Sequence, residues 1–236
     1  GRDNAAARAA ALVNSDAAWL EDIHARISAK LARTSRRIGD SLAFVSIDGR
    51  YQPWTGDRVP IYWWTNSFWA GLLWLMYREN GDEFYRQTAE SIEAQLDEAL
   101  TGYDGLHHDV GFMWSLTSVA NCKLTGNDRS RRRAMTAASL LASRFNLKGG
   151  YIRAWNDDKV VWAIVDCMMN LPLLYWASEQ SRDQRFAHVA RAHADTAIRT
   201  VQRPDGSVNH IVVFDPDIGE VLETPAGQGY ASGSSW

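Results

Sequence analysis

The 236-residue chain has few of the residues that build disulfide scaffolds or thiolate metal sites. Its two cysteines, Cys122 and Cys167, both lie in apolar stretches, and neither belongs to a Cys-x-x-Cys or mixed Cys/His pattern. Free, buried thiols are the expected state of such cysteines. The sequence therefore argues against a disulfide-stapled fold and against a zinc site built on cysteine.

Strong charge of one sign and long uncharged apolar runs are also lacking. The net charge is −3, and the basic cluster at residues 129–133 is typical of an exposed helix face rather than of a nucleic-acid-binding surface. No stretch of about 18 uncharged apolar residues is present, so neither a nucleic-acid partner nor a membrane partner is expected. Residues 1–6 do not have the pattern of a signal peptide. The compartment, cytoplasmic or periplasmic, is left open.

Tryptophan is abundant. The chain has 11 Trp within a hydrophobic content of 46%. This content is ample for the core of one large domain. Many of the tryptophans lie near glycines and polar residues, as in pockets that stack sugar rings, although tryptophan is also ordinary core material.

Apolar and amphipathic helices alternate along the chain. Apolar helices are expected over residues 66–80, 111–125 and 160–176, and an amphipathic helix follows each of them, starting near Asp82, Asp128 and Asp183. These three aspartates are 46 and 55 residues apart, which is too irregular for a solenoid. The alternation predicts an inner ring of buried helices surrounded by an outer ring, that is, an all-α toroid of helical hairpins.

The pattern changes after Arg203. Residues 207–214 alternate like a strand, residues 215–219 read as a turn and residues 220–222 as a return strand, so a small β-hairpin is expected near 207–222. Such a hairpin could carry His210 to the rim of the toroid. The loops at 101–109 and 149–158, rich in Gly, His, Trp and Asp, are expected at the mouth of the central cavity, where a site would form.

Asp166 is the first candidate for acid–base chemistry. It is the sole ionisable carboxylate of residues 160–176, and in a buried helix its pKa would be raised. At helical spacing Trp162, Asn170 and Leu173 would share its face. A carboxyl group poised near neutrality suits a general acid. A structural aspartate hydrogen-bonded to Asn170 or to the backbone is the alternative.

Asp109 is the second candidate. It lies at the start of an inner helix, where the helix dipole favours the ionised form, so the two aspartates suit an acid/base pair for glycosidic chemistry. A simple helix N-cap is the alternative. His107, His108 and Asp109 could also be metal ligands, but adjacent positions seldom point at one ion and no distant Cys or His completes the set. Neither a metal nor another cofactor is expected.

Five segments of the sequence are informative when they are taken together and in order. They are WTNSFWAGLLW (64–74), LHHDVGF (106–112), IRAW (152–155), VDCMMNLPLL (165–174) and GQGYASGSSW (227–236). As a set they resemble the signature stretches of the unsaturated glucuronyl hydrolases, glycoside hydrolase family 88. The resemblance implies an (α/α)6 barrel and an enzyme that acts on oligosaccharides left by polysaccharide lyases, releasing a Δ4,5-unsaturated uronic acid from the non-reducing end.

The same resemblance implies a particular mechanism. Family members protonate C4 of the vinyl ether and add water at C5, and the resulting hemiketal opens and releases the sugar. By position, Asp166 matches the general acid/base and Asp109 the second essential carboxylate, which helps to hold the substrate and to tune the first. The positions that match the sugar subsite are His108, Trp155, His210, Gln228 and, less closely, Trp64.

The family pattern continues beyond the point where Trp236 stands. The chain is therefore expected to be one catalytic domain, residues 1–236, truncated at its C-terminal end, lacking a family site arginine and exposing apolar inner helices, whereas the full-length protein is expected to be a monomer. The alternatives are an unsaturated rhamnogalacturonyl hydrolase, a sugar-binding toroid without catalysis, and a sugar epimerase that would rely on His108 and His210. The His-His-Asp and Asp-Cys-x-x-Asn-Leu-Pro stretches favour the glucuronyl group. The sequence does not identify the parent polysaccharide or its sulfation.

Overall fold

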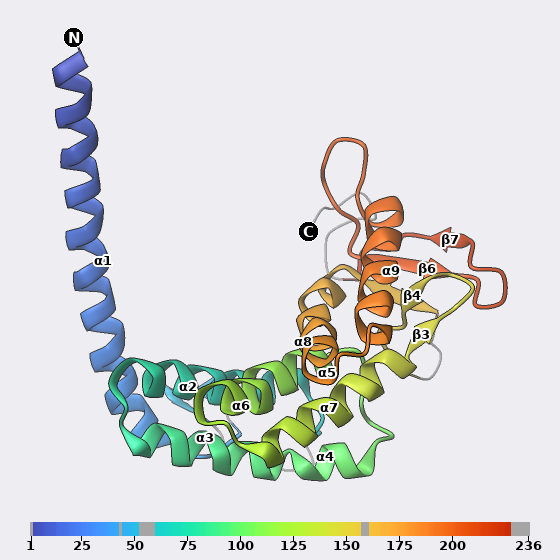
Figure 1. The fold of residues 1–236 in the computed structure, drawn as a ribbon, viewed down its shortest axis with the longest axis horizontal. Coiled ribbons are helices and arrows are strands. Elements are labelled where there is room, and N and C mark those ends of the chain that lie inside the picture. The colour runs from blue at the N-terminus through green and yellow to red at the C-terminus, as the bar shows by residue number, and fades with distance from the viewer. Residues whose placement is uncertain (1, 43, 52–59, 157–160, 228–236) are drawn as a thin grey trace.

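The computed structural model describes residues 2–42, 44–51, 60–156 and 161–227, with side chains described from residue 16 onward. These residues are mostly helical, and short antiparallel strands lie toward one end of the molecule (Figure 1). The prediction of an all-α toroid with a small β-hairpin is confirmed. In the described part of the chain, no helix combines the length and the apolar character needed to cross a membrane.

Apolar helices alternate with amphipathic ones, as the sequence predicts. The apolar helices are α2 (Phe68–Asn80), the continuous run of α5 (Val110–Trp114), the π-helix η2 (Ser115–Val119) and α6 (Ala120–Thr125), and α8 (Leu171–Ser181). Their amphipathic partners are α3 (Glu83–Gln95), which leads into the short α4 (Asp97–Gly102), α7 (Asp128–Ser143) and α9 (Arg185–Thr200). α2 packs against α3 and η2, α5 against α7 and α8, and α8 against α9. The apolar helices therefore form an inner row backed by the amphipathic ones, in an open arc rather than a closed ring (Figure 1).

Polar caps and left-handed glycines set the helix boundaries. The Asp82 side chain accepts a hydrogen bond from a backbone amide in the first turn of α3. The equivalent cap of α7 is Asn127 rather than Asp128. α2 and α6 end at Gly81 and Gly126, whose φ angles of 70° and 74° are readily adopted by glycine. The hairpin turns that the sequence predicts are thus built by local chemistry.

The segment before α8 departs from the prediction of one long helix over residues 160–176. It contains strand β5 (Trp162–Ile164), then the 3-10 helix η4 (Val165–Met169), and α8 begins only after it. A β-branched and aromatic run prefers an extended strand, and Pro172 in the first turn of α8 marks where a helix can start. Trp162, Asp166, Asn170 and Leu173 therefore do not share the face of one helix.

Three small sheets complete the fold. β1 (Ser46–Ile47) pairs with β2 (Arg50–Tyr51), and β3 (Phe145–Asn146) with β4 (Tyr151–Ile152). The predicted hairpin is β6 (Ile211–Phe214) with β7 (Val221–Glu223), and β5 adds a third antiparallel strand on its other edge. The register pairs Ile164 with Ile211, so the end of β5 lies directly beside the start of β6. This pairing places the segment that leads to Asp166 beside His210, although the two are distant in the sequence.

The tryptophans divide between the core and the neighbourhood of the loops at residues 101–109 and 149–156. Trp74 and Trp114, on the inner helices, are 2% and 0% exposed and lie in the hydrophobic core. Burying a large apolar side chain stabilises the fold by at least about 1.5–3 kcal/mol. Trp69 donates a 2.9 Å hydrogen bond to the carbonyl of Gly39 and so fastens α2 to the end of α1 (Arg2–Ile38).

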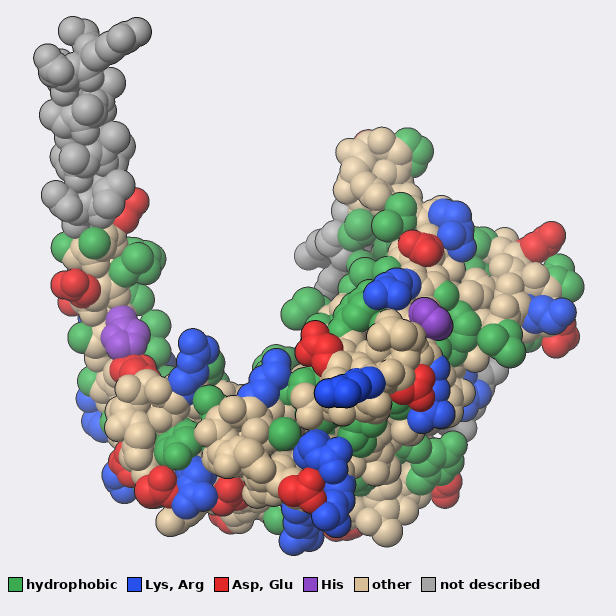
Figure 2. Space-filling view, viewed as in Figure 1, with side chains coloured by type: hydrophobic (Ala, Val, Ile, Leu, Met, Phe, Trp, Pro, Cys, Tyr) green, Lys and Arg blue, Asp and Glu red, His purple; other side chains and the backbone are tan. Residues whose placement is uncertain are grey.

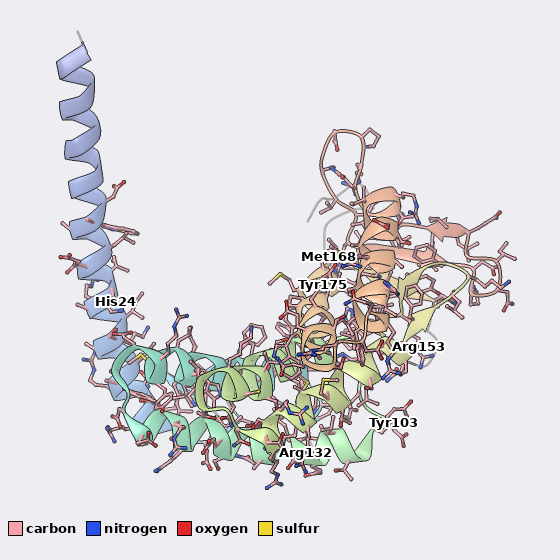
Figure 3. All side chains as sticks on the ribbon, in the orientation of Figure 1. His24, Tyr103, Arg132, Arg153, Met168 and Tyr175 are labelled. Atoms are coloured by element: carbon pink, nitrogen blue, oxygen red, sulfur yellow. The ribbon has the colours of Figure 1, made fainter. Side chains whose placement is uncertain are left out.

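α1 projects from the body as one arm of the arc (Figure 1). Leu31 and Ile38 pack against the core, but farther from the body Leu20 and Ile27 are 57% and 51% exposed. Hydrophobic side chains are visible on this arm in Figure 2. On α8 and the preceding turn, Tyr175 and Met168 are 37% and 39% exposed, and Figure 3 shows both on the side nearer α1. Apolar side chains are thus exposed both on α1 and at the end of the arc that carries α8.

We expect the 236-residue chain to associate with itself through this apolar surface. Leu20 and Ile27 lie on one face of α1, so changing both to Gln should shift the protein toward monomer in analytical ultracentrifugation. Ala25→Gln, also exposed but on the opposite face, is the matched control and should leave the sedimentation unchanged. Equal sedimentation of the double variant and the wild type would contradict the prediction.

Candidate active site

Asp109 lies at the end of the loop that enters α5. The backbone amide of His108 donates a 3.0 Å hydrogen bond to the carbonyl of Ala154, which joins this loop to the loop after β4. Asp109 occupies the N-cap position of α5, but its side chain caps no amide there. The carboxylate is therefore left to make other contacts.

His108 connects the two candidate carboxylates. Its Nε2 atom lies 3.2 Å from Oδ1 of Asp109 and 3.8 Å from Oδ1 of Asp166. On the other side of Asp109, Nδ1 of His107 lies 3.4 Å from Oδ2. The structure thus brings together Asp109, His108 and Asp166, which the sequence places in two different segments. It does so although Asp166 lies in a 3-10 turn rather than inside a long helix.

Asn170 holds the Asp109 carboxylate from the side of α8. Its Nδ2 atom donates to Oδ1 of Asp109 at 3.2 Å, and its own Oδ1 accepts from the amide of Phe112 at 2.7 Å. Because the Phe112 amide can only donate, the Asn170 carbonyl must face it and the NH2 group must face Asp109. Asn170 was expected as a possible partner of Asp166, but it is hydrogen-bonded to Asp109 instead.

Gly111 permits this contact. A Cβ atom at position 111 would lie 2.5 Å from Cα, Cβ and the carbonyl oxygen of Asn170, which no side chain could tolerate without a backbone shift. α5 and the residue before α8 are therefore in direct backbone contact at the point where Asp109 is held.

We expect Gly111→Ala to lower the free energy of unfolding by about 1–3 kcal/mol, because the added methyl group must push Asn170 away. The same shift should break the hydrogen bond from Asn170 to Asp109. Gly102→Ala is the matched control, since no atom lies within 4 Å of a Cβ built there. Urea unfolding of the two variants measures the effect. A Gly111→Ala protein as stable as the control would show that the contact is not tight.

The charge state of Asp109 differs from the one that the sequence predicts, whereas the pKa of Asp166 is raised as predicted. Burial, and next the charge of Asp166, raise the pKa of Asp109 to about 7, against the opposing effects of Asn170 and Arg144. Burial also raises the pKa of Asp166, while the backbone amides of Asp166 and Cys167 oppose the rise. The prediction that the helix dipole favours the ionised form of Asp109 is wrong, because the side chain is only 4% exposed and its burial outweighs the dipole. Asp166, whose side chain is 49% exposed, is the more accessible of the two.

The raised pKa of Asp109 predicts a pH-dependent cost to stability. Its pKa is 3.8 in an unfolded chain and about 7 in the fold, so its contribution to stability is fully present below about pH 4 and is lost as the pH rises through 7. Asp109→Asn should therefore gain stability over the wild type between about pH 4 and pH 7, by no more than roughly 4 kcal/mol.

Thermal unfolding of both proteins across this pH range checks the prediction. The comparison is needed because burial lowers the pKa of His107 to about 3, and this buried imidazole changes the stability with pH in the opposite direction. The difference between variant and wild type reports Asp109 together with its coupling to Asp166, and it removes the contribution of His107. A difference that stays constant across the range would refute the assignment.

Both histidines of the cluster are neutral in the fold. Burial, and then the charge of Arg144, lower the pKa of His107, and burial lowers the pKa of His108 well below its ordinary value. One potential ligand atom from each of His107, His108 and Asp109 lies within 4.8 Å of the others. The geometric reason for discounting a metal, that adjacent side chains seldom converge, therefore does not apply here.

An aromatic wall borders the cluster. The ring of Trp155 stacks on the ring of Trp63, and the two ring centroids are 6.4 Å apart. The ring centroids of Trp155 and His107 are 4.4 Å apart. Trp64, the tryptophan named from the sequence, packs instead against Phe68 at 5.6 Å. The tryptophan beside Trp155 is thus Trp63. Two adjacent tryptophans before a helix cannot be told apart by pattern alone, so the sequence held no signal for this choice.

His210 lies beside the Asp166 turn, as the hairpin prediction required. Its carbonyl accepts a 3.0 Å hydrogen bond from the amide of Val165, and its imidazole is largely buried, which lowers its pKa. A Cβ at Gly227 would lie 2.9 Å from Nδ1 of this ring, so the chain passes closely over it. Gln228, also named from the sequence, lies outside the described residues.

Arg144 was missed by sequence analysis. It follows α7 and is 9% exposed. Its guanidinium donates hydrogen bonds of 2.9–3.1 Å to four carbonyls, those of Leu106, Arg153, Ala154 and Trp155. It thereby joins the loop that carries His107 and His108 to the loop that carries Trp155. An arginine at the end of an amphipathic helix usually faces solvent, so its sequence position does not reveal this role.

No family model matches the chain. An unsaturated glucuronyl hydrolase from Bacillus sp. (strain GL1) is 37% identical over 213 residues, which are 87% of this chain and 55% of that protein. An unsaturated chondroitin disaccharide hydrolase from Streptococcus pyogenes serotype M1 is 35% identical over a region that covers 73% of this chain and 44% of that protein. A UGL variant solved with dGlcA-Glc-Rha-Glc superposes with a TM-score of 0.79 at 36% identity, over 87% of this chain and 55% of that one.

The chain spans about half the length of the curated relatives that it matches. Within that span the agreement covers both sequence and fold, and it includes the segments that carry Asp109 and Asp166. The chain belongs to the unsaturated glucuronyl hydrolase family.

Proposed function

We propose that the protein containing this chain is a glycoside hydrolase that releases a Δ4,5-unsaturated uronic acid from the non-reducing end of lyase-generated oligosaccharides. The observation that carries the proposal is the convergence of Asp109, His108 and Asp166 beside Trp155. The relatives named as unsaturated glucuronyl and chondroitin disaccharide hydrolases support the reaction class, and the relative solved with a dGlcA oligosaccharide supports the substrate class.

Asp166 is the proposed proton donor and acceptor because it is the carboxyl group that a substrate can reach. Its side chain is 49% exposed, and its pKa is raised by burial. In the proposed sequence the carboxyl gives its proton to C4 of the alkene, and positive charge develops at C5, where the ring oxygen shares it. Water then attacks C5 and gives a proton back to the carboxylate. The resulting hemiketal opens by breaking the bond between C5 and the ring oxygen, which gives a ketone at C5 and a hemiacetal at C1. Collapse of this hemiacetal to an aldehyde breaks the glycosidic bond and releases the rest of the oligosaccharide as an alcohol.

Asp109 is proposed to act on the substrate indirectly, through its electrostatic coupling to Asp166. With a pKa near 7 it holds a proton for part of the time at neutral pH, and the charge of Asp166 disfavours its ionisation. Such coupling keeps one proton on the pair, as an acid near neutrality requires. His108, Trp155, His210, Gln228 and Trp64 are proposed to line the sugar subsite, and Trp63 is added to them on the strength of its stacking against Trp155.

Further features of the whole protein are proposed as well. A monomeric state for the full-length protein, one catalytic domain and the lack of nucleic-acid or membrane partners follow from the family resemblance and from the net charge of −3. No cofactor takes part in the proposed steps.

The test uses the full-length protein that contains this chain. It is incubated with unsaturated disaccharides derived from chondroitin, hyaluronan, heparin and rhamnogalacturonan, and the absorbance of the conjugated double bond is followed. Decay with a glucuronyl disaccharide is expected, and the order of rates identifies the substrate. Decay confined to the rhamnogalacturonan product, or no decay with any of them, would overturn the proposal.

A further inference from the structure

Three adjacent side chains converge on one buried point at the start of α5. One potential ligand atom from each of His107, His108 and Asp109 lies within 4.8 Å of the other two. The three side chains are 3%, 0% and 4% exposed. Consecutive residues reach a common point here because the chain turns sharply from loop into helix, with the amides of Val110 and Gly111 bonded back to the carbonyls of His107 and His108.

The spacing of the ligand atoms suits a small tetrahedral ion. Nδ1 of His107 lies 3.4 Å from one oxygen of Asp109, and Nε2 of His108 lies 3.2 Å from the other. Zinc bonds of 2.0–2.1 Å at tetrahedral angles put neighbouring ligand atoms about 3.3 Å apart. Nδ1 of His107 also accepts a 3.3 Å hydrogen bond from the backbone amide of Asp109, and an ion bound at this atom would replace that bond.

The buried imidazole of His108 has unmet hydrogen-bonding capacity. Neither of its nitrogens has a hydrogen-bond partner among the residues that the structure describes, and the 3.2 Å approach to Asp109 is a close contact without hydrogen-bond geometry. A buried polar group in this state is costly, and it points to a missing water, ligand or ion. Coordination through Nε2 would satisfy it.

The site is held rigidly and is open on one side. Arg144 and the amide of His108 fix the backbone of the loop, and Asn170 fixes the Asp109 carboxylate. Toward solvent lies Asp166, whose Oδ1 is 3.8 Å from Nε2 of His108 and whose side chain is half exposed. An ion could enter from this side, and water or Asp166 could complete its coordination.

We propose that His107, His108 and Asp109 form a binding site for a transition-metal ion, Zn²⁺ in the first instance, and that the bound ion inhibits the enzyme. Two imidazoles and one carboxylate with an open fourth position are a donor set that suits Zn²⁺ and Cu²⁺ rather than Mg²⁺ or Ca²⁺. Inhibition follows because the ion occupies Asp109 and His108. This second part rests on the proposed function, whereas metal binding does not.

The first test is spectroscopic and needs no substrate. Co²⁺, a coloured stand-in for Zn²⁺, is titrated into the protein, and a tetrahedral visible spectrum without a thiolate band is expected, displaced by one equivalent of Zn²⁺. Histidine side-chain NMR of the wild type should show His107 and His108 shifting on addition of Zn²⁺. Shifts at His24, which pairs with Glu79 on the surface, or at exposed His188 instead would overturn the proposal, as would a thiolate band from Cys122.

The second test uses variants. His108→Gln and the nearly isosteric Asp109→Asn should each weaken Zn²⁺ binding by about 100-fold or more, because even the loss of an indirect partner of a metal ligand costs 10–100-fold. His188→Gln is the matched control, and circular dichroism confirms folding. Unchanged affinity in a folded Asp109→Asn protein would refute the site.

The third test addresses inhibition. In the absorbance assay, Zn²⁺ should inhibit the wild type at the concentrations at which it binds, Mg²⁺ should not, and a chelator should restore the rate. Binding without inhibition would refute the second part alone. A protein with no activity toward any unsaturated disaccharide would refute the proposed function and leave the result on metal binding intact.

Discussion

Asp166→Asn is expected to lower kcat by about 10²–10⁴-fold while leaving substrate binding nearly unchanged. The amide is close to the carboxylate in shape, so the turn of η4 and the 3.8 Å approach to His108 should persist. It cannot, however, give a proton to carbon and then take one from water. The measurement is turnover by alkene absorbance, with binding followed separately by calorimetry.

The control for this variant is Asp217→Asn. Asp217 is an exposed aspartate in the turn between β6 and β7, so its change to Asn should leave both turnover and binding as in the wild type. Turnover near the wild-type rate in Asp166→Asn would remove Asp166 from the mechanism. A comparable loss in Asp109→Asn would then point to Asp109 as the proton donor, in keeping with its pKa of about 7.

Helical periodicity made the architecture predictable. The alternation of apolar and amphipathic segments, with Asp82 and Gly81 at one junction, follows from local rules of capping and burial, and these rules hold in the fold. The hairpin of β6 and β7 was also predicted, although β6 is a run of four buried apolar residues rather than an alternation of apolar and polar ones. Local signals of this kind do not depend on what packs against them.

The segment at residues 160–176 could not be predicted correctly, because its fate depends on a distant partner. A short apolar run is compatible with either a helix or a strand, and β5 becomes a strand by pairing with β6, whose residues lie about 50 positions later. The same pairing determines the environment of Asp166. Its partial exposure was therefore hidden from sequence analysis, although its place in the site was not.

The charge state of Asp109 illustrates the same limit. Sequence position suggested an ionised carboxylate at a helix start, but tertiary burial outweighs the helix dipole. Asn170 and Gly111 decide how deeply the side chain is held, and their contact joins segments that are about 60 residues apart. A group that costs stability when it ionises is well suited to hold a proton near neutral pH, so the instability and the proposed role have one origin.

Arg144→Met is expected to cause the largest loss of stability. The variant removes four hydrogen bonds from buried or half-buried carbonyls. Two of these carbonyls keep another donor, because Asn156 also donates to Leu106 and the amide of His108 to Ala154. Among the residues that the structure describes, no second donor reaches the carbonyls of Arg153 and Trp155, and at about 1–3 kcal/mol for each unsatisfied group the expected cost is roughly 2–6 kcal/mol.

The expected effect of Arg144→Met on the site follows from the same bonds, since the guanidinium joins the loop of His107 and His108 to the loop of Trp155. Arg144→Lys should be intermediate, because one ammonium group cannot reach all four carbonyls. Arg153→Met changes an exposed arginine at the surface (Figure 3) and should stay within about 0.5 kcal/mol of the wild type. Urea unfolding gives the stabilities, and near-ultraviolet circular dichroism of the tryptophans reports the loop. An Arg144→Met protein as stable as Arg153→Met would mean that the four carbonyls find other donors and that the loops do not depend on this side chain.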